Sequence, residues 1–317
     1  MSKIQKAINE IQSSRNKART PGAVSQLGVL VDKRDVPGDD EAPEALLGDE
    51  TRQIAALETP VSTKLVEVSR KSLTDAGFIA PDDEEQLIIN QFRQIKRPLI
   101  AHAFGKRATK IEGGHVILVT SALPGDGKTF SCINLALSIA SEQDRSVLLI
   151  DGDVAKAHVS RLFGIEEQPG LTDILQRDSD YDLSDVIVET DVDGLSLIPA
   201  GKMNSHVTEL FASNRMERLI KAVSAQDPNR VVIFDSSPLL PTSESRVLST
   251  LVGQVVLIVC ANKTPRSAVL NAIEMMEEGK AVNVVLNQAR NEAGFDYYGG
   301  RYGYAAGERA AEESRQE

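Results

Sequence analysis

Short apolar runs alternate with amphipathic stretches along the chain from about residue 98 onwards. The runs are four to eight residues long, rich in Val, Ile and Leu, and nearly continuous; they cover residues 115–122, 146–150, 195–199, 230–234, 254–260 and 281–286. Strands that are buried on both faces have this pattern, so we expect a parallel sheet covered by helices. The stretches between the runs predict helices over residues 129–142, 208–225 and 267–278. This order predicts a doubly wound, mostly parallel, Rossmann-like α/β fold with its ligands at the carboxyl ends of the strands.

The pattern is absent from both ends of the chain. Residues 1–20 carry five basic residues, one acid and three isoleucines on one helix face, which is typical either of a docking helix or of a solvated terminus. Residues 32–50 have the composition of an acidic linker. We therefore expect three regions: an N-terminal basic helix and acidic linker over 1–85, largely disordered; a folded domain over 86–290 that starts with a helix over 86–96; and a flexible tyrosine-rich tail over 291–317.

Composition narrows the class of protein. Of the 317 residues, 41% are hydrophobic and 26% are charged, as in an ordinary soluble chain. The net charge of −11 and the absence of Trp argue against a protein that binds nucleic acid. With Cys132 and Cys260 as the two cysteines, neither a disulfide framework nor a cysteine zinc site is expected. No stretch is apolar enough for a spanning helix and none resembles a secretory signal, so a cytoplasmic protein is predicted.

A phosphate-binding loop follows the first predicted strand. Residues 122–129 read Ala-Leu-Pro-Gly-Asp-Gly-Lys-Thr and match the Walker A pattern, except that Ala122 replaces the first glycine. The two glycines allow backbone torsions that turn N–H groups inward around a β-phosphate. Lys128 is expected to reach the β- and γ-phosphate oxygens, and Thr129 to offer its hydroxyl to Mg²⁺. The predicted nucleotide-binding residues are Gly125, Asp126, Gly127, Lys128, Thr129 and Phe130.

Three aspartates end apolar strands that are expected to flank this loop. Asp151 and Asp153 follow one buried run, and Asp235 ends another. Because the carboxyl ends of core strands form the ligand edge of a doubly wound sheet, we expect these carboxylates to converge on a Mg²⁺–triphosphate. One of them would hold metal-bound water, and another would accept the proton of an incoming hydroxyl. Each aspartate alone would fit a helix N-cap or a turn equally well.

These motifs resemble those of the bacterial tyrosine kinases (BY-kinases) of the capsule and exopolysaccharide type, in the cytosolic form without a fused membrane module. The likeness runs from about residue 86 to residue 304. The loop resembles the family's Walker A motif, Ile150–Asp153 its Walker A′ motif and Phe234–Pro238 its Walker B motif. The resemblance implies a protein-tyrosine autokinase, a P-loop NTPase that uses ATP and Mg²⁺. It implies these roles: phosphate and metal binding by Lys128 and Thr129, a catalytic base at Asp151, and metal binding by Asp153 and Asp235.

A cluster of tyrosines marks the tail. Four of the five tyrosines lie within eight residues and alternate with glycines: Tyr297, Tyr298, Tyr302 and Tyr304. We interpret them as phosphoacceptors on a flexible ribbon, the alternative being an aromatic tail with a packing role. A tail that starts just after the last strand favours transfer to a neighbouring subunit, and hence a homo-oligomer. The resemblance further implies peripheral docking at the inner membrane, on the cytosolic end of a membrane polysaccharide co-polymerase (chain-length protein).

Some positions depart from the family pattern. The basic residues and proline that usually follow the second motif are reduced to Lys156, and Ser236-Ser237 precede Pro238 where the family usually has Thr-Pro-Pro. The family helix that mediates subunit contacts carries Glu-x-x-Arg-x-x-Arg, and its nearest match here is Asn90, Arg93 and Lys96. The departures leave the oligomer contacts more open than the nucleotide site.

Two other functions stay open at this stage. Partition and septum-placement ATPases have a similar loop but carry a signature lysine at the position of Leu123. A catalytically inactive, nucleotide-binding regulator of polysaccharide export would have no need of the tyrosine cluster. Both features favour the kinase.

Overall fold

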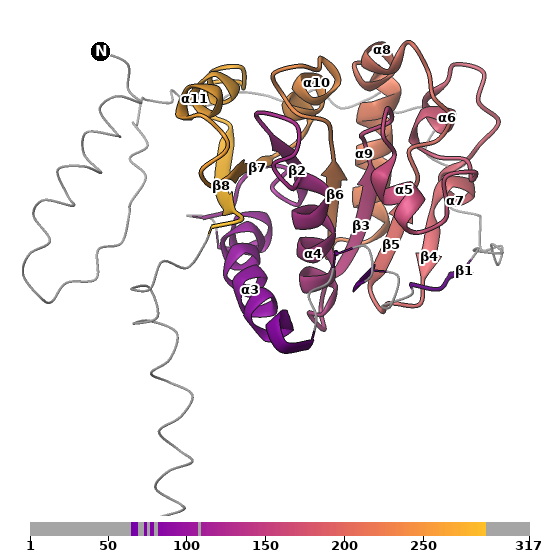
Figure 1. Cartoon of the computed structure of the whole chain (residues 1–317). Coiled ribbons are helices and arrows are strands. Elements are labelled where there is room, and N and C mark those ends of the chain that lie inside the picture. The colour runs from indigo at the N-terminus through magenta and orange to yellow at the C-terminus, as the bar shows by residue number, and fades with distance from the viewer. Residues whose placement is uncertain (1–64, 69–72, 75–76, 79–81, 107–108, 290–317) are drawn as a thin grey trace, which may run out of the picture. The chain divides into compact units, whose positions relative to one another are not determined.

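The computed structural model describes residues 65–68, 73–74, 77–78, 82–106 and 109–289, and these form a sheet with helices on both faces (Figure 1). The strand order is β1-β4-β5-β3-β6-β2-β7-β8. Neighbouring strands are parallel, apart from the antiparallel pair β4 and β5. The prediction of a doubly wound, mostly parallel α/β sheet is therefore confirmed. The predicted basic helix, the acidic linker over 32–50 and the tail tyrosines lie outside the described residues.

All of the predicted strands are present, within two residues at either end. They are β2 (Val116–Ser121), β3 (Ser146–Asp151), β5 (Leu195–Ile198), β6 (Arg230–Asp235), β7 (Gln254–Cys260) and β8 (Ala281–Asn287). Two short strands had no sequence signal, β1 (Leu65–Val66) and β4 (Val188–Thr190). β1 lies in the segment predicted to be largely disordered, yet it pairs with β4, so this part of the segment belongs to the sheet.

Two hydrophobic clusters fill the two faces of the sheet. Alternate residues of each strand point to opposite faces: in β2, Ile117 and Val119 enter one cluster, and Val116 and Leu118 the other. The first face is covered by α3 (Asp82–Phe104), α4 (Lys128–Ala140) and α5 (His158–Leu162). The second is covered by α6 (Leu171–Leu175), α7 (Leu183–Val186), α8 (Val207–Phe211), α9 (Asn214–Gln226), α10 (Glu244–Leu251) and α11 (Arg266–Glu274). Burial on both faces explains why the strands read as continuous apolar runs.

Three helices differ from their predicted extents, and the one predicted over 267–278 ends at Glu274. The helix predicted over 208–225 is two helices, because Phe211 is drawn fully into the core and Ser213 starts a new helix by accepting a hydrogen bond from the N–H of Met216. The helix predicted over 86–96 begins at residue 82 and continues through Pro98. Proline removes one helical hydrogen bond, but Leu99 beyond it is almost fully buried, so packing carries the helix onward.

Lys96 fastens α3 to α4. Only 5% of this residue is exposed, its Nζ donates to the carbonyl oxygen of Ser138 at 2.5 Å, and it pairs with Glu142 at 2.7 Å. Arg93, by contrast, is exposed and donates to Asn90 on the same helix. Of the three positions that match the family's subunit-contact pattern, Lys96 is thus committed within its own chain.

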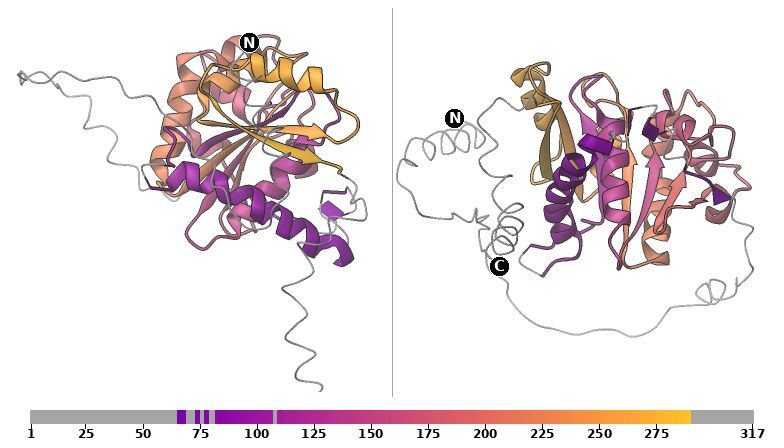
Figure 2. Two further views of the ribbon diagram at one scale, coloured as in Figure 1. Left: turned by 90° about the vertical axis from the view of Figure 1, so that its left-hand side faces the viewer. Right: turned by 60° about the horizontal axis from the view of Figure 1, so that its bottom comes forward.

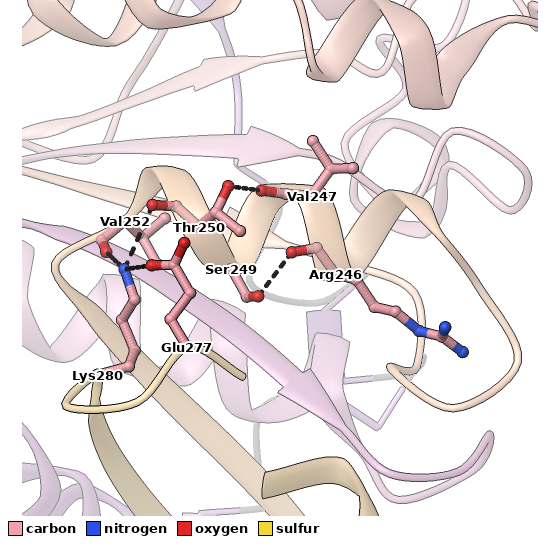
Figure 3. A network of polar contacts seen from close by, with 7 residues as sticks. All are labelled: Arg246, Val247, Ser249, Thr250, Val252, Glu277 and Lys280. Carbon is pink, nitrogen blue, oxygen red and sulfur yellow. Dashed lines mark hydrogen bonds and ion pairs between the residues drawn. The ribbon is translucent and has the colours of Figure 1, made fainter. Parts of the chain in front are cut away.

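Lys280 closes the junction between α10 and the last two strands (Figure 3). Its Nζ donates to the carbonyl oxygens of Thr250 at 3.3 Å and Val252 at 2.7 Å, and lies 3.6 Å from Glu277. Carbonyl groups at the end of a helix have no partner within the helix, so this lysine satisfies them.

Within the described residues, no helix is long and apolar enough to cross a membrane.

Candidate active site

The phosphate loop joins β2 to α4 at the carboxyl edge of the sheet. Gly125 and Gly127 have φ angles of +87° and +89°, in the left-handed region that disfavours side chains. Space around Gly125 is open, so the torsion alone demands glycine there. At Gly127 a Cβ would also lie 2.1 Å from Nδ2 of Asn287. Gly127, the residue before α4, has no side chain that could cap the helix. The first N–H groups of this helix therefore remain available to an anion.

Asp151 and Asp235 lie side by side at the ends of adjacent parallel strands. The hydroxyl of Thr129 donates to Oδ2 of Asp235 at 2.7 Å. Ser160 donates to Oδ2 of Asp151 through its N–H at 2.8 Å and its hydroxyl at 2.7 Å. Oδ1 of each aspartate is buried without a hydrogen-bond partner. Leaving a buried carboxylate oxygen unpaired is unfavourable, so both atoms are available to a ligand.

Burial dominates the electrostatics of these groups. Desolvation, followed by repulsion from Asp151, raises the pKa of Asp235 to about 8. Desolvation raises the pKa of Asp151 to about 6, against the opposing effect of the hydrogen bonds from Ser160. Desolvation also lowers the pKa of Lys128, which is 8% exposed, while attraction to Asp235 and Asp153 acts in the opposite direction. The nucleotide-free site therefore holds acids and a base in surroundings that disfavour their charges.

Asp153 occupies a more open position than the other two aspartates. It lines a cavity of about 240 Å³ whose walls include Pro124 of the loop, Lys156, Met203, Pro238 and Glu244. Asp151 and Asp235 do not line this cavity. Of the three predicted aspartates, Asp153 is thus the one that a molecule in this cavity meets.

Mg²⁺ fits the residues beside the loop. The Thr129 hydroxyl donates a hydrogen bond to Asp235, which leaves the lone pairs of the Thr129 oxygen free for a cation. The unpaired Oδ1 atoms of Asp235 and Asp151 are hard oxygen donors of the kind that Mg²⁺ prefers. In the described part of the chain, no group of three or more His, Cys, Asp or Glu residues could hold a metal ion. Mg²⁺ usually takes one or two carboxylates plus substrate phosphates, so the nucleotide itself would complete the coordination.

The structure brings together Lys128, Thr129 and the three predicted aspartates. The side chain of Phe130 packs elsewhere. Its ring lies against Phe92 of α3, with centroids 6.3 Å apart. The ring also lines a groove of about 700 Å³ between α3 and β8, which run side by side at one border of the sheet (Figure 2). What remains of Phe130 for a nucleotide is its backbone N–H at the start of α4.

Three residues that the sequence analysis missed support the site. Ser160 holds Asp151, Thr264 donates to Oδ1 of Asp126 at 2.7 Å, and Asn287 donates to the carbonyl oxygen of Asp126 at 2.9 Å. Asn287 ends the last predicted strand as Asp235 ends its own, so the rule that found the aspartates could have found it. Ser160 and Thr264 lie in short segments without a motif, and the sequence carries no signal for them.

A family model described as an AAA domain matches residues 114–285, which is more than half of the 317 residues. The chain belongs to this AAA domain family. The matched residues include the loop over 122–129 and the sheet around it.

The relatives that resemble this chain include bacterial tyrosine-protein kinases. The chain is 29% identical over 236 residues to the tyrosine-protein kinase YwqD of Bacillus subtilis (strain 168), which covers 73% of this chain and 94% of YwqD. It is 28% identical over 240 residues to the tyrosine-protein kinase ptk of Acinetobacter johnsonii, covering 75% of this chain but only 31% of that longer relative. Among solved structures, the VpsO kinase domain is 30% identical with a TM-score of 0.55, covering 67% of this chain and all of that domain. The predicted resemblance to bacterial tyrosine kinases is confirmed.

Proposed function

We propose that this chain is an ATP- and Mg²⁺-dependent protein-tyrosine autokinase that regulates the synthesis or export of an exopolysaccharide or capsule. The observation that supports this most is the pair Asp151 and Asp235, in register beside Thr129, each with one buried carboxylate oxygen kept unpaired. Such a pair beside a phosphate loop suits a triphosphate with its metal ion. The kinase names of the relatives give the reaction class.

The loop and its lysine supply most of the charge stabilisation. Loop N–H groups and the start of α4 receive the phosphates, and Lys128 balances the charge that develops on the β- and γ-phosphate oxygens. Thr129 and Asp235 would hold Mg²⁺, with Asp151 beside them, and the ion would supply positive charge against the phosphates. Little covalent help from the protein is needed, because phosphoryl transfer depends mainly on position and charge.

We assign the catalytic base to Asp153, which the sequence analysis expected to bind the metal ion, in place of Asp151, which it expected to be the base. Asp153 lines the cavity that opens beside the loop, whereas Asp151 is fully buried and its Oδ2 is held by Ser160. A catalytic base must first lie within hydrogen-bond reach of the tyrosine hydroxyl, and its pKa matters only after that. In the step, the hydroxyl proton passes to the base, a bond forms from the tyrosine oxygen to the γ-phosphorus, and ADP leaves.

The acceptors we propose are Tyr297, Tyr298, Tyr302 and Tyr304, modified by a neighbouring copy of the chain in a homo-oligomer. Each phosphate adds a charge of about −1.5 to −2, so a fully modified tail would repel its neighbours and loosen the assembly. The partner we propose is the cytosolic end of a membrane polysaccharide co-polymerase, which would hold the chain at the inner membrane from the cytoplasm. No nucleic-acid partner is proposed for a chain with a net charge of −11.

The decisive experiment is phosphotyrosine mapping by mass spectrometry, with and without ATP. The parent chain should gain ATP-dependent phosphotyrosine in the tail, and Lys128→Met should lose about 100-fold or more of that signal. Asp153→Asn should lose transfer while it still binds Mg·ATP, whereas Asp235→Asn should weaken Mg²⁺-dependent binding too. A Lys128→Met chain mixed with an active chain that lacks residues 291–317 should be labelled in trans.

Three outcomes would point elsewhere. Full phosphotyrosine in Lys128→Met would exclude this site as the kinase. ATP hydrolysis without phosphotyrosine would favour the partition-type ATPase. Nucleotide binding with neither reaction would favour the inactive regulator.

A further inference from the structure

Two distant segments hold the middle of the phosphate loop. Oδ1 of Asp126 accepts a hydrogen bond from the Thr264 hydroxyl at 2.7 Å, and the Asp126 carbonyl oxygen accepts one from Nδ2 of Asn287 at 2.9 Å. Thr264 lies between β7 and α11, and Asn287 is the last residue of β8. Because β7 and β8 follow β2 in the sheet order, their carboxyl ends meet the loop that leaves β2.

Each of these two residues is itself held in place. The N–H of Cys260 donates to the Thr264 hydroxyl oxygen at 3.1 Å, which leaves the hydroxyl proton to point at Asp126. Oδ1 of Asn287 accepts a hydrogen bond from the N–H of Gln288 at 2.9 Å, and the backbone carbonyl oxygen of Asn287 accepts one from the N–H of Ala261 at 2.8 Å. Both donors are thus oriented toward the loop by the ends of the strands that carry them.

The loop needs such support because its own backbone is permissive. Gly125 and Gly127 both take left-handed torsions, and glycine loses more conformational freedom on ordering than any other residue. Nδ2 of Asn287 lies 2.1 Å from the place where a Cβ of residue 127 would be. The asparagine therefore packs directly on the loop, one residue before Lys128.

We propose that Thr264 and Asn287 are positioning residues that hold the phosphate loop in the conformation that receives the phosphates of the nucleotide. They act through Asp126 and Gly127 and do not touch the nucleotide. A loop that is already ordered binds more tightly than one that the ligand must order. The inference rests on the nucleotide-binding part of the proposed function and does not depend on the kinase reaction.

Thr264 should matter more than Asn287. Oδ2 of Asp126 is already buried without a partner, and only 3% of the residue is exposed. Without the Thr264 hydroxyl, neither oxygen of this carboxylate would have a partner. The loop would then rearrange to hydrate the carboxylate. Loss of Asn287 leaves one carbonyl unpaired and an open space beside Gly127.

The test is calorimetric titration with Mg·ATP, Mg·ADP and inorganic tripolyphosphate. Thr264→Val and Asn287→Leu should bind all three about 5- to 30-fold more weakly than the parent chain, with the larger loss in Thr264→Val. Thr264→Ser keeps the hydroxyl and should bind within about twofold of the parent. Hydrogen exchange of the loop amides in the nucleotide-free chain should speed up in Thr264→Val and Asn287→Leu.

The matched control is Thr250→Val. This exposed threonine also donates its hydroxyl to a carbonyl oxygen, that of Val247 at 2.8 Å, but within α10 (Figure 3). Its nucleotide affinity and loop exchange should equal those of the parent. An equal loss in this control would overturn the proposal, since the effect would then reflect general destabilisation.

Two further results would overturn it. If Asn287→Leu weakened ATP binding but not tripolyphosphate binding, the asparagine would act on the base or ribose. If Thr264→Val and Asn287→Leu bound tripolyphosphate like the parent, the loop would need no such support. A parent chain that binds nucleotide yet forms no phosphotyrosine would defeat the kinase assignment and leave this inference standing.

Discussion

At the amino end of β7, Gln254 is fully buried and both ends of its side-chain amide have partners. Nε2 donates to the carbonyl oxygens of Leu99 at 3.1 Å and Gly114 at 2.5 Å, and Oε1 lies 2.9 Å from Nδ1 of His102. At the carboxyl end of the same sheet, Asp151 and Asp235 are equally buried, yet Oδ1 of each has no partner.

The two ends of the sheet thus differ in whether their buried polar atoms have hydrogen-bond partners. Buried polar atoms are normally paired, because an unpaired one loses its hydration without compensation. The amide at the amino end follows that rule and ties α3 to the sheet. The carboxylates at the carboxyl end break it beside a phosphate loop, where a nucleotide and its metal ion would supply the missing partners. The comparison predicts that changes at the first end affect stability alone, and that changes at the second affect stability and ligand binding in opposite directions.

The largest expected effect concerns the pH dependence of stability in the nucleotide-free chain. In the unfolded chain Asp235 has its ordinary pKa of 3.8, but burial in the folded chain raises its pKa to about 8. Between these values the folded state binds more protons than the unfolded state, so the free energy of unfolding falls as pH rises. Asp151 adds the same trend up to about pH 6. In Asp235→Asn the fall between about pH 5 and pH 8 should shrink by on the order of 3 kcal/mol.

Urea unfolding at a series of pH values measures this effect. Asp227→Asn is the control, because a hydrogen bond from Ser146 lowers the pKa of Asp227. Its contribution to stability is lost only as pH falls below about 4, so this variant should follow the parent at higher pH. Parallel curves for Asp235→Asn and the parent would show that Asp235 is ionised in the folded chain, and the carboxyl end would then not be destabilising.

A smaller effect is expected at the amino end. Gln254→Leu removes the amide and its hydrogen bonds to the carbonyl oxygens of Leu99 and Gly114, which should lower the free energy of unfolding by about 2 kcal/mol. Affinity for Mg·ADP should stay unchanged. Gln226→Leu, at an exposed position at the end of α9, should change stability by less than about 0.5 kcal/mol. A loss of nucleotide affinity in Gln254→Leu would mean that the two ends of the sheet are coupled.

The smallest effect is expected at Lys280, which satisfies the carbonyl oxygens after α10 (Figure 3). Lys280→Met keeps the aliphatic stem and should cost about 1 kcal/mol of unfolding free energy. Lys221→Met is the control, because its pair with Glu217 spans 3.9 Å and its side chain is 79% exposed; such pairs contribute close to nothing. Equal losses in thermal or urea unfolding would show that Lys280 acts as an ordinary surface charge.

The sequence by itself determined the central strands and the carboxyl edge of the sheet. Continuous apolar runs of four to eight residues are typical of strands covered on both faces, and the glycines before Lys128 favour a tight turn at the start of a helix. Asp151 and Asp235 were predictable for the same reason, since a polar residue that ends a buried strand must emerge at the edge of the sheet. Local patterns carry this information because burial and backbone torsion act residue by residue.

Tertiary structure alone decided the rest. β1 and β4 are too short for a pattern of their own and form by pairing, β1 with β4 and β4 also with β5. Asp151 and Asp153 are two residues apart in the same motif, and only the tertiary structure gives them different surroundings, with Ser160 bound to the first and an open cavity at the second. Thr264 and Asn287 reach Asp126 across 138 and 161 residues of sequence. Such contacts depend on which strand ends become neighbours, and strand order is set by the whole sheet, not by the residues that it brings together.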